Sequence, residues 1–179
     1  MIFLKITKFV NIPQFTTDGN YQIDVDLRRV PQWIKTEQKE ANLQLNPVFQ
    51  RGHVWNEKQQ VSWLEFFLKG GKSGDVVYFN CPSWHHKVPD KNYNEYVCVD
   101  GLQRLTAICR FINNEIKVFG SYFSEYEDPI FLNRHTLKIN INDLKSEKEV
   151  MQWYVDMNSA GTQHSNEEIE RVRQMILKL

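Results

Sequence analysis

The stretch that organises this chain is Tyr96-Val97-Cys98-Val99-Asp100-Gly101-Leu102-Gln103-Arg104-Leu105-Thr106. Its first part, Val97-Cys98-Val99, is apolar, and Asp100-Gly101 interrupts that run. From Leu105 onward, apolar residues recur every three or four positions. This change of period predicts a buried strand that turns sharply into a helix, with Gln103-Arg104 in the first helical turn.

The turn at Asp100-Gly101 has the composition of an anion site. Free backbone N–H groups at a helix N-terminus, the guanidinium of Arg104 and the close approach that Gly101 permits together suit a phosphate. The alternative interpretation is an ordinary strand-to-helix turn in which Asp100 caps the helix. The turn by itself is compatible with both interpretations.

The composition indicates a globular chain with a neutral charge balance. Of 179 residues, 41% are hydrophobic, so one domain with a substantial core is expected. No apolar run approaches the roughly 18–20 residues of a membrane span. Basic and acidic residues number 22 each, whereas a dedicated nucleic-acid binder usually carries a basic excess. Cys81, Cys98 and Cys109 form no CxxC pair, which favours a reducing, cytoplasmic compartment over a disulfide framework or a zinc site.

The hydrophobic periodicity predicts further strands and helices along the chain. Strands are expected over residues 3–9, 21–25, 75–80 and 136–141, with briefer strands at 43–45 and 116–119. Helices are expected over residues 31–41 and 57–69, from the central turn to residue 114, and after the N-cap residues Ser146 and Ser165. Residues 120–133 are expected to form an aromatic loop or a short helix.

Two further segments are polar and irregular. The first, Asn46-Pro47-Val48-Phe49-Gln50-Arg51-Gly52-His53-Val54-Trp55, fits no regular period and is typical of a loop held by large side chains. The second is the small-residue turn 158–165 between the last two helices. A third feature, His85-His86, has no surrounding carboxylate pattern, so a surface loop is favoured over a metal site.

Three segments together resemble the N-terminal domain of GmrSD-type restriction systems, which belongs to the ParB/sulfiredoxin-like superfamily. They are Asn46-Pro47-x-Phe49-Gln50-Arg51-Gly52-x-Val54-Trp55, Val99-Asp100-Gly101-Leu102-Gln103-Arg104-Leu105-Thr106 and Asn158-x-x-Gly161-Thr162. The resemblance implies an α+β fold with a small mixed sheet flanked by helices. It also implies a ParB/sulfiredoxin-like domain over residues 1–142 and a C-terminal helical extension over 143–179 packed on it.

The same resemblance implies that the central turn handles a nucleoside triphosphate, often hydrolysing it, and so regulates cleavage of modified DNA by a nuclease. Carried over residue by residue, it implies catalytic roles for Asp100, Gln103 and Arg104, with Mg²⁺ at Asp100. It implies nucleotide or phosphate contacts from Gln50, Arg51, Gly101, Asn158, Gly161 and Thr162. In this interpretation the arginines clamp phosphate oxygens, Asp100 holds Mg²⁺ or orients the attacking water, and Gln103 hydrogen-bonds that water or the γ-phosphate.

The sequence departs from the family pattern at two places. Leu102 stands where a Gln is common, which removes one ligand contact, and Gln163-His164 stands where relatives often have Pro-Leu. No HNH nuclease pattern is visible after the last helix. We therefore expect a domain that acts without its own nuclease, alongside a partner nuclease subunit and DNA, and with no membrane association.

Other functions and other roles for these residues remain open at this point. The chain can be a non-catalytic nucleotide- or DNA-sensing module, or a decoy, that regulates a partner nuclease. A ParB-like nuclease acting directly on DNA is disfavoured by the neutral charge and by the lack of an evident metal cluster. Structurally, Arg51 can pair with Asp100 to fix the loop, and Asn158 with Thr162 can satisfy backbone groups between two helices.

Overall fold

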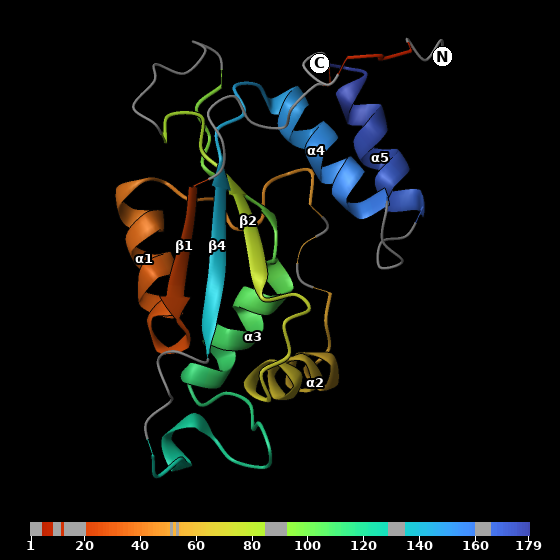
Figure 1. The fold of residues 1–179 in the computed structure, drawn as a ribbon. Coiled ribbons are helices and arrows are strands. Elements are labelled where there is room, and N and C mark those ends of the chain that lie inside the picture. Colours follow the sequence, from red (N-terminus) through yellow and green to blue (C-terminus); the bar gives the residue numbers. More distant parts are fainter. Residues whose placement is uncertain are drawn as a thin grey trace.

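The computed structural model describes residues 5–8, 12, 21–50, 52, 54–84, 93–128, 135–159 and 166–179. Its strands are β1 (Tyr21–Asp26), β2 (Val76–Asn80), β3 (Val97–Asp100) and β4 (Thr136–Asn142). Its α-helices are α1 (Val30–Glu40), α2 (Glu57–Leu68), α3 (Leu102–Ile112), α4 (Glu147–Ser159) and α5 (Asn166–Ile176) (Figure 1). Two 3₁₀ turns complete the described elements, η2 at Leu27–Arg29 and η3 at Phe123–Glu125.

The four strands form one mixed sheet in the order β1-β4-β2-β3. β4 pairs antiparallel with β1 and parallel with β2, and β2 pairs antiparallel with β3. The parallel pair requires a crossover, and α3 lies within that connection. The expected α+β class, with a mixed sheet flanked by helices and a C-terminal helical segment, is confirmed.

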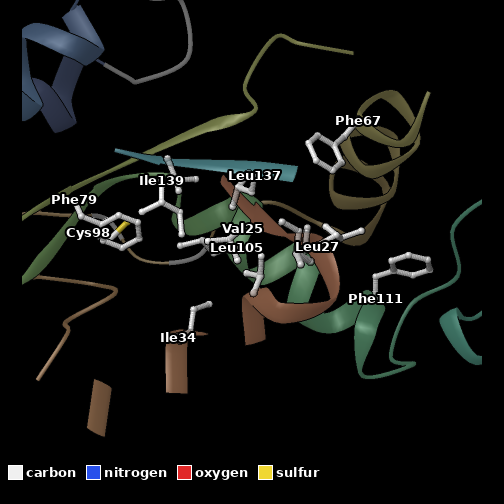
Figure 2. Close-up of a cluster of buried hydrophobic side chains, with 14 of the residues drawn as sticks. Val25, Leu27, Ile34, Phe67, Phe79, Cys98, Leu105, Phe111, Leu137 and Ile139 are labelled. Carbon is white, nitrogen blue, oxygen red and sulfur yellow. The ribbon is translucent and has the colours of Figure 1, made fainter. Parts of the chain in front are cut away.

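The main core lies between one face of the sheet and helices α1, α2 and α3. Each strand supplies alternate residues to it because successive side chains of a strand point to opposite faces. Figure 2 shows part of this cluster, which includes Val25, Ile34, Phe67, Phe79, Cys98, Leu105, Phe111, Leu137 and Ile139. These side chains are at least nine-tenths buried, so this face of the sheet is closed to ligands.

A second core joins the opposite face of β2 and β3 to helices α4 and α5. Val97 and Val99 belong to it because they alternate with Cys98, which faces the main core. Tyr78 packs edge-on against Trp153 of α4, with ring centroids 5.9 Å apart. In Figure 1, α4 and α5 lie together, away from α1 and α2. The turn that follows β3 therefore lies between two packed layers.

Most predicted elements are confirmed, including the Asn56–Gln59 capping box at the start of α2. The strand expected over residues 116–119 is wrong, because this segment forms only an isolated bridge between Val118 and Ser121. The strand expected over 43–45 is likewise a single bridge, in which Gln44 exchanges hydrogen bonds with the free edge of β3. Both segments are too short to continue the sheet.

Residues 5–8, part of the strand expected over 3–9, are exposed and not in a strand, and the rest of that range lies outside the described residues. The division into domains 1–142 and 143–179 stays a prediction. Within the described part of the chain, no helix is long and apolar enough to cross a membrane.

Candidate functional site

The turn after β3 requires a glycine for two independent reasons. Gly101 has φ 123° and ψ 0°, a backbone conformation that L-residues with a Cβ rarely adopt. A Cβ at this position would also lie 2.4 Å from Cγ1 of Val77 on the neighbouring strand β2. The turn thus brings the start of α3 close to the sheet.

Asp100 does not cap α3, so the capping interpretation of the turn is wrong. The N-cap position is Gly101, which has no side chain to offer, and the Asp100 carboxylate instead accepts a hydrogen bond from Arg104 through Oδ2. The pair joins the last residue of β3 to the first turn of α3, four residues further along the chain. Oδ1 of Asp100 has no hydrogen-bond donor among the described residues, and the carboxylate is 32% exposed.

Arg104 is more deeply placed than a surface phosphate clamp. Its side chain is 13% exposed, and Nη1 donates to the backbone carbonyls of Gly74, at 3.1 Å, and Val76, at 2.8 Å. Nη2 donates to Asp100. The guanidinium therefore ties the loop before β2 to the first turn of α3, and Asp100 balances its charge.

Gln103 joins the same helical turn to the loop that precedes α2. Its Oε1 accepts from the backbone N–H groups of Val54, at 2.9 Å, and Trp55, at 3.0 Å. Its Nε2 donates to the carbonyl of Gly52 at 2.8 Å. Holding this loop is the role of Gln103 that the contacts display, while its contact with a water or a γ-phosphate stays a prediction.

Gln50 and Asn158 are also bonded to backbone carbonyls. Gln50 Nε2 donates to Cys98 and, at 3.1 Å, to Val99, which fixes the 46–50 segment along β3. Asn158 Nδ2 donates to Tyr154, one turn back in α4, at 2.7 Å. Three predicted site residues, Arg51, Gly161 and Thr162, lie outside the described residues, as does the His85-His86 pair.

The segments meet around an open cleft of about 1000 Å³. Its middle is formed by the end of β3 and the start of α3, one side by α2 and the loop before it, and the other side by α4. All six predicted site residues that the structure describes line it: Gln50, Asp100, Gly101, Gln103, Arg104 and Asn158. The fold thus gathers side chains from three distant segments into one concave surface.

The α2 side of the cleft carries residues that are not among the site residues predicted from the sequence. Trp55, Lys58, Gln59, Ser62, Trp63 and Phe66 all line it. Phe67 of α2 is buried, but Phe66 beside it is 47% exposed. The sequence could have indicated this exposure. Phe66 follows buried Leu64 by two residues and therefore lies about 200° around the helix from it.

Charge in the described lining is unevenly distributed. The charged residues there are Lys58, Asp100 and Arg104, and the last two form a pair. Lys58 is exposed and makes no ion pair with a described residue. It is therefore the uncompensated positive charge that this part of the cleft presents to a ligand.

The cysteines contribute no reactive thiolate to this surface. Burial raises the pKa of the Cys98 thiol far above its usual range, and the neighbouring Asp100 carboxylate raises it further. Burial also raises the pKa of Cys109 to about 11. All three cysteines are free thiols, and those at 98 and 109 are protonated at neutral pH, which suits packing and not nucleophilic catalysis.

Comparison with protein families agrees with the resemblance found in the sequence. Residues 32–136 match the family described as GmrSD restriction endonuclease, N-terminal domain. This match covers more than half of the chain, so the chain belongs to that family and is a component of the restriction-system type. The match includes the Gln50 and Asp100–Arg104 segments but ends before Asn158. No curated protein and no solved structure matched the chain, and its relation to ParB-like folds stays a prediction.

Proposed function

We propose that the cleft binds a nucleoside triphosphate and hydrolyses it, and that this reaction regulates DNA cleavage by a partner nuclease of a modification-dependent restriction system. The observation that carries the proposal is the convergence of all six described site residues on one cleft. A volume of about 1000 Å³ is at the upper end of the range for small-molecule pockets and accommodates a nucleotide.

The middle of the cleft, at the start of α3, suits phosphate groups. The N-terminus of α3 opens there without a side-chain cap, so its first N–H groups and the helix dipole favour an anion. Lys58 supplies a further positive charge. Arg104 keeps donors that the observed hydrogen bonds do not use, because a guanidinium carries five N–H groups.

Asp100 is the residue best placed to act on a water molecule. Oδ2 is held by Arg104, which leaves Oδ1 free to accept a hydrogen bond from the attacking water. Attack forms a bond between the water oxygen and the γ-phosphorus and breaks the bond to the β,γ-bridging oxygen, giving a nucleoside diphosphate and inorganic phosphate. The water proton passes to Oδ1 of Asp100 or to a phosphate oxygen.

Mg²⁺ fits this site as an ion that arrives with the phosphates. Among the described residues, no group of three or more His, Cys, Asp or Glu side chains is arranged to hold a metal ion. Mg²⁺ in nucleotide sites is commonly bound by one or two carboxylates together with substrate phosphates, and Asp100 is the carboxylate available in the described lining. When bound, the ion would neutralise charge on the phosphate oxygens.

A non-catalytic sensor is the second candidate, and the bonding of Gln103 supports it. Both polar atoms of its amide are bonded to the backbone of Gly52, Val54 and Trp55, which commits Gln103 to the protein framework and not to a catalytic water. In this candidate the nucleotide binds without being hydrolysed, and the partner nuclease recognises the occupied cleft.

Phosphate release from ATP, GTP, CTP and UTP separates the two candidates. We expect turnover of at least one nucleotide by the native chain, and a fall of about 100-fold or more in Asp100→Asn with binding retained. Nucleotide binding by the native chain without turnover would overturn the hydrolase and leave the sensor. Turnover that is unchanged in Asp100→Asn would show that another residue acts on the water.

A further inference from the structure

We propose that the α2 side of the cleft is a nucleobase subsite, in which the base of the triphosphate stacks on an aromatic wall made by Trp55, Trp63 and Phe66. The inference rests on the proposed function and adds where, and by what chemistry, the nucleoside part is held. Large aromatic side chains left exposed inside a cleft mark a binding surface, because their burial by a ligand is favourable.

Phe66 is the clearest member of this wall. It is 47% exposed, although it is a large apolar residue on a helix that has a well-packed core face. One side of its ring rests on Gly71, where a Cβ would lie within 2.5 Å of three ring atoms. The ring is thus supported from beneath, which leaves its other surface for a planar ligand.

Trp55 and Trp63 are fixed in place before any ligand arrives. Trp63 stacks on buried Phe67, with centroids 5.3 Å apart and planes inclined by 23°. The ring centroids of Trp55 and Trp63 are 6.2 Å apart. The backbone of Trp55 is bonded at both ends, since its N–H donates to Gln103 and its carbonyl accepts from Gln60 at 3.0 Å.

The fixed wall explains why Gln103 is committed to the loop. By holding the Trp55 N–H, Gln103 connects the turn at the phosphate end of the cleft to the aromatic side. A preorganised aromatic surface binds a base with less loss of conformational freedom than a mobile one. Gln103 therefore acts as a positioning residue for base binding.

The polar groups along the wall indicate a charged aromatic ligand and not an apolar peptide or a lipid. Lys58 and Ser62 line the cleft from α2, and Ser73 lines it beside Gly74. Gly74 is flanked by both sides of the site, because a Cβ there would lie 3.4 Å from Arg104 Nη1 and 3.4 Å from Trp63 Nε1. A base on the wall and phosphates at the α3 turn would therefore lie in adjoining parts of the cleft, as the two parts of one nucleotide must.

The test compares ligands with and without a base. Binding of ATP, GTP, CTP, UTP and inorganic tripolyphosphate is measured by calorimetry on the native chain, Phe66→Ala and Phe119→Ala. Phe119 is the matched control, since it is 49% exposed and lies outside the described cleft lining. For each nucleotide that binds the native chain, we expect Phe66→Ala to lower the affinity by about fivefold to a hundredfold. The affinity for tripolyphosphate should be unchanged. Phe119→Ala should change neither.

Tryptophan fluorescence provides a second readout on the native chain. Nucleotides should quench it through contact with Trp55 and Trp63, and tripolyphosphate should not. Equal nucleotide affinities in Phe66→Ala and the native chain, without quenching, would overturn the base subsite and leave the proposed function standing. A parallel loss of tripolyphosphate binding in Phe66→Ala would overturn it too, because the ring would then act on the phosphate side. Failure of the native chain to bind any of the five ligands would instead overturn the proposed function.

Discussion

The two sides of the cleft differ in how their polar groups are used. At the α3 turn, Arg104 and Gln103 together make six hydrogen bonds within the protein, five of them to backbone groups. At α2, Lys58 makes no ion pair with a described residue and Phe66 is half exposed. The side-chain polar groups of Gln103 and most of those of Arg104 therefore build the cleft, whereas Lys58 and Phe66 are free to meet a ligand.

Replacing Gly101 by Ala should have the largest effect on stability. The substitution combines a strained backbone, at φ 123°, with a Cβ placed 2.4 Å from Val77. We expect a loss of about 3–5 kcal/mol in the free energy of unfolding, measured by urea denaturation. Gly120→Ala is the matched control, because Gly120 has φ 83° but no atom within 4 Å of the new Cβ. Similar losses in both variants would show that close packing on Val77 contributes little.

Replacing Arg104 by Ala should have the second largest effect on stability. It leaves the carbonyls of Gly74 and Val76 without their donor and removes the partner of Asp100. We expect a loss of about 2–4 kcal/mol in the same measurement, with no rescue by added phosphate. Arg173→Ala, at a 53% exposed ion pair, should change stability by less than about 1 kcal/mol. If Arg104→Ala were as stable as the control, the hydrogen bonds of Arg104 to Gly74 and Val76 would contribute little to folding.

Replacing Lys58 by Gln should have the smallest effect and should act on binding alone. We expect nucleotide and tripolyphosphate affinity to fall about fivefold at low salt, with a smaller difference at high salt because exposed charges are screened. Lys148→Gln is the matched control, since Lys148 is also exposed and also follows a Glu at the start of a helix, but lies outside the described lining. Equal affinities in the two variants would remove Lys58 from the phosphate site.

Much of the fold was predictable from local pattern. The hydrophobic periodicity predicted the four strands and five α-helices of the described residues, and the capping box located the start of α2 to the residue. The strand expected over 3–9 fails at residues 5–8, and the other failures, at 43–45 and 116–119, are short apolar runs. There the period is compatible with a strand, but too few neighbouring backbone groups are available to form one.

The sequence predicted which residues would lie together, but it did not predict their hydrogen-bond partners. Asp100 and Arg104 were expected to share a site, and they do line one cleft, but the capping role considered for Asp100 is wrong. Besides Asp100, the partners of Arg104 are the carbonyls of Gly74, 30 residues away on the loop before β2, and of Val76, 28 residues away on β2. Such partners depend on which strands become neighbours, and a local sequence pattern does not contain that information.

The sequence alone determined the strand–turn–helix unit at residues 96–106, the glycine at its corner and the family to which the chain belongs, because these depend on local period, backbone conformation and side-chain order. Only the tertiary structure decided the strand order β1-β4-β2-β3, the bonding of Gln103 to the 52–55 loop and the exposure of Phe66 inside the cleft. Each of these depends on surfaces far apart in the chain, which meet only when the sheet closes and the helices pack on it.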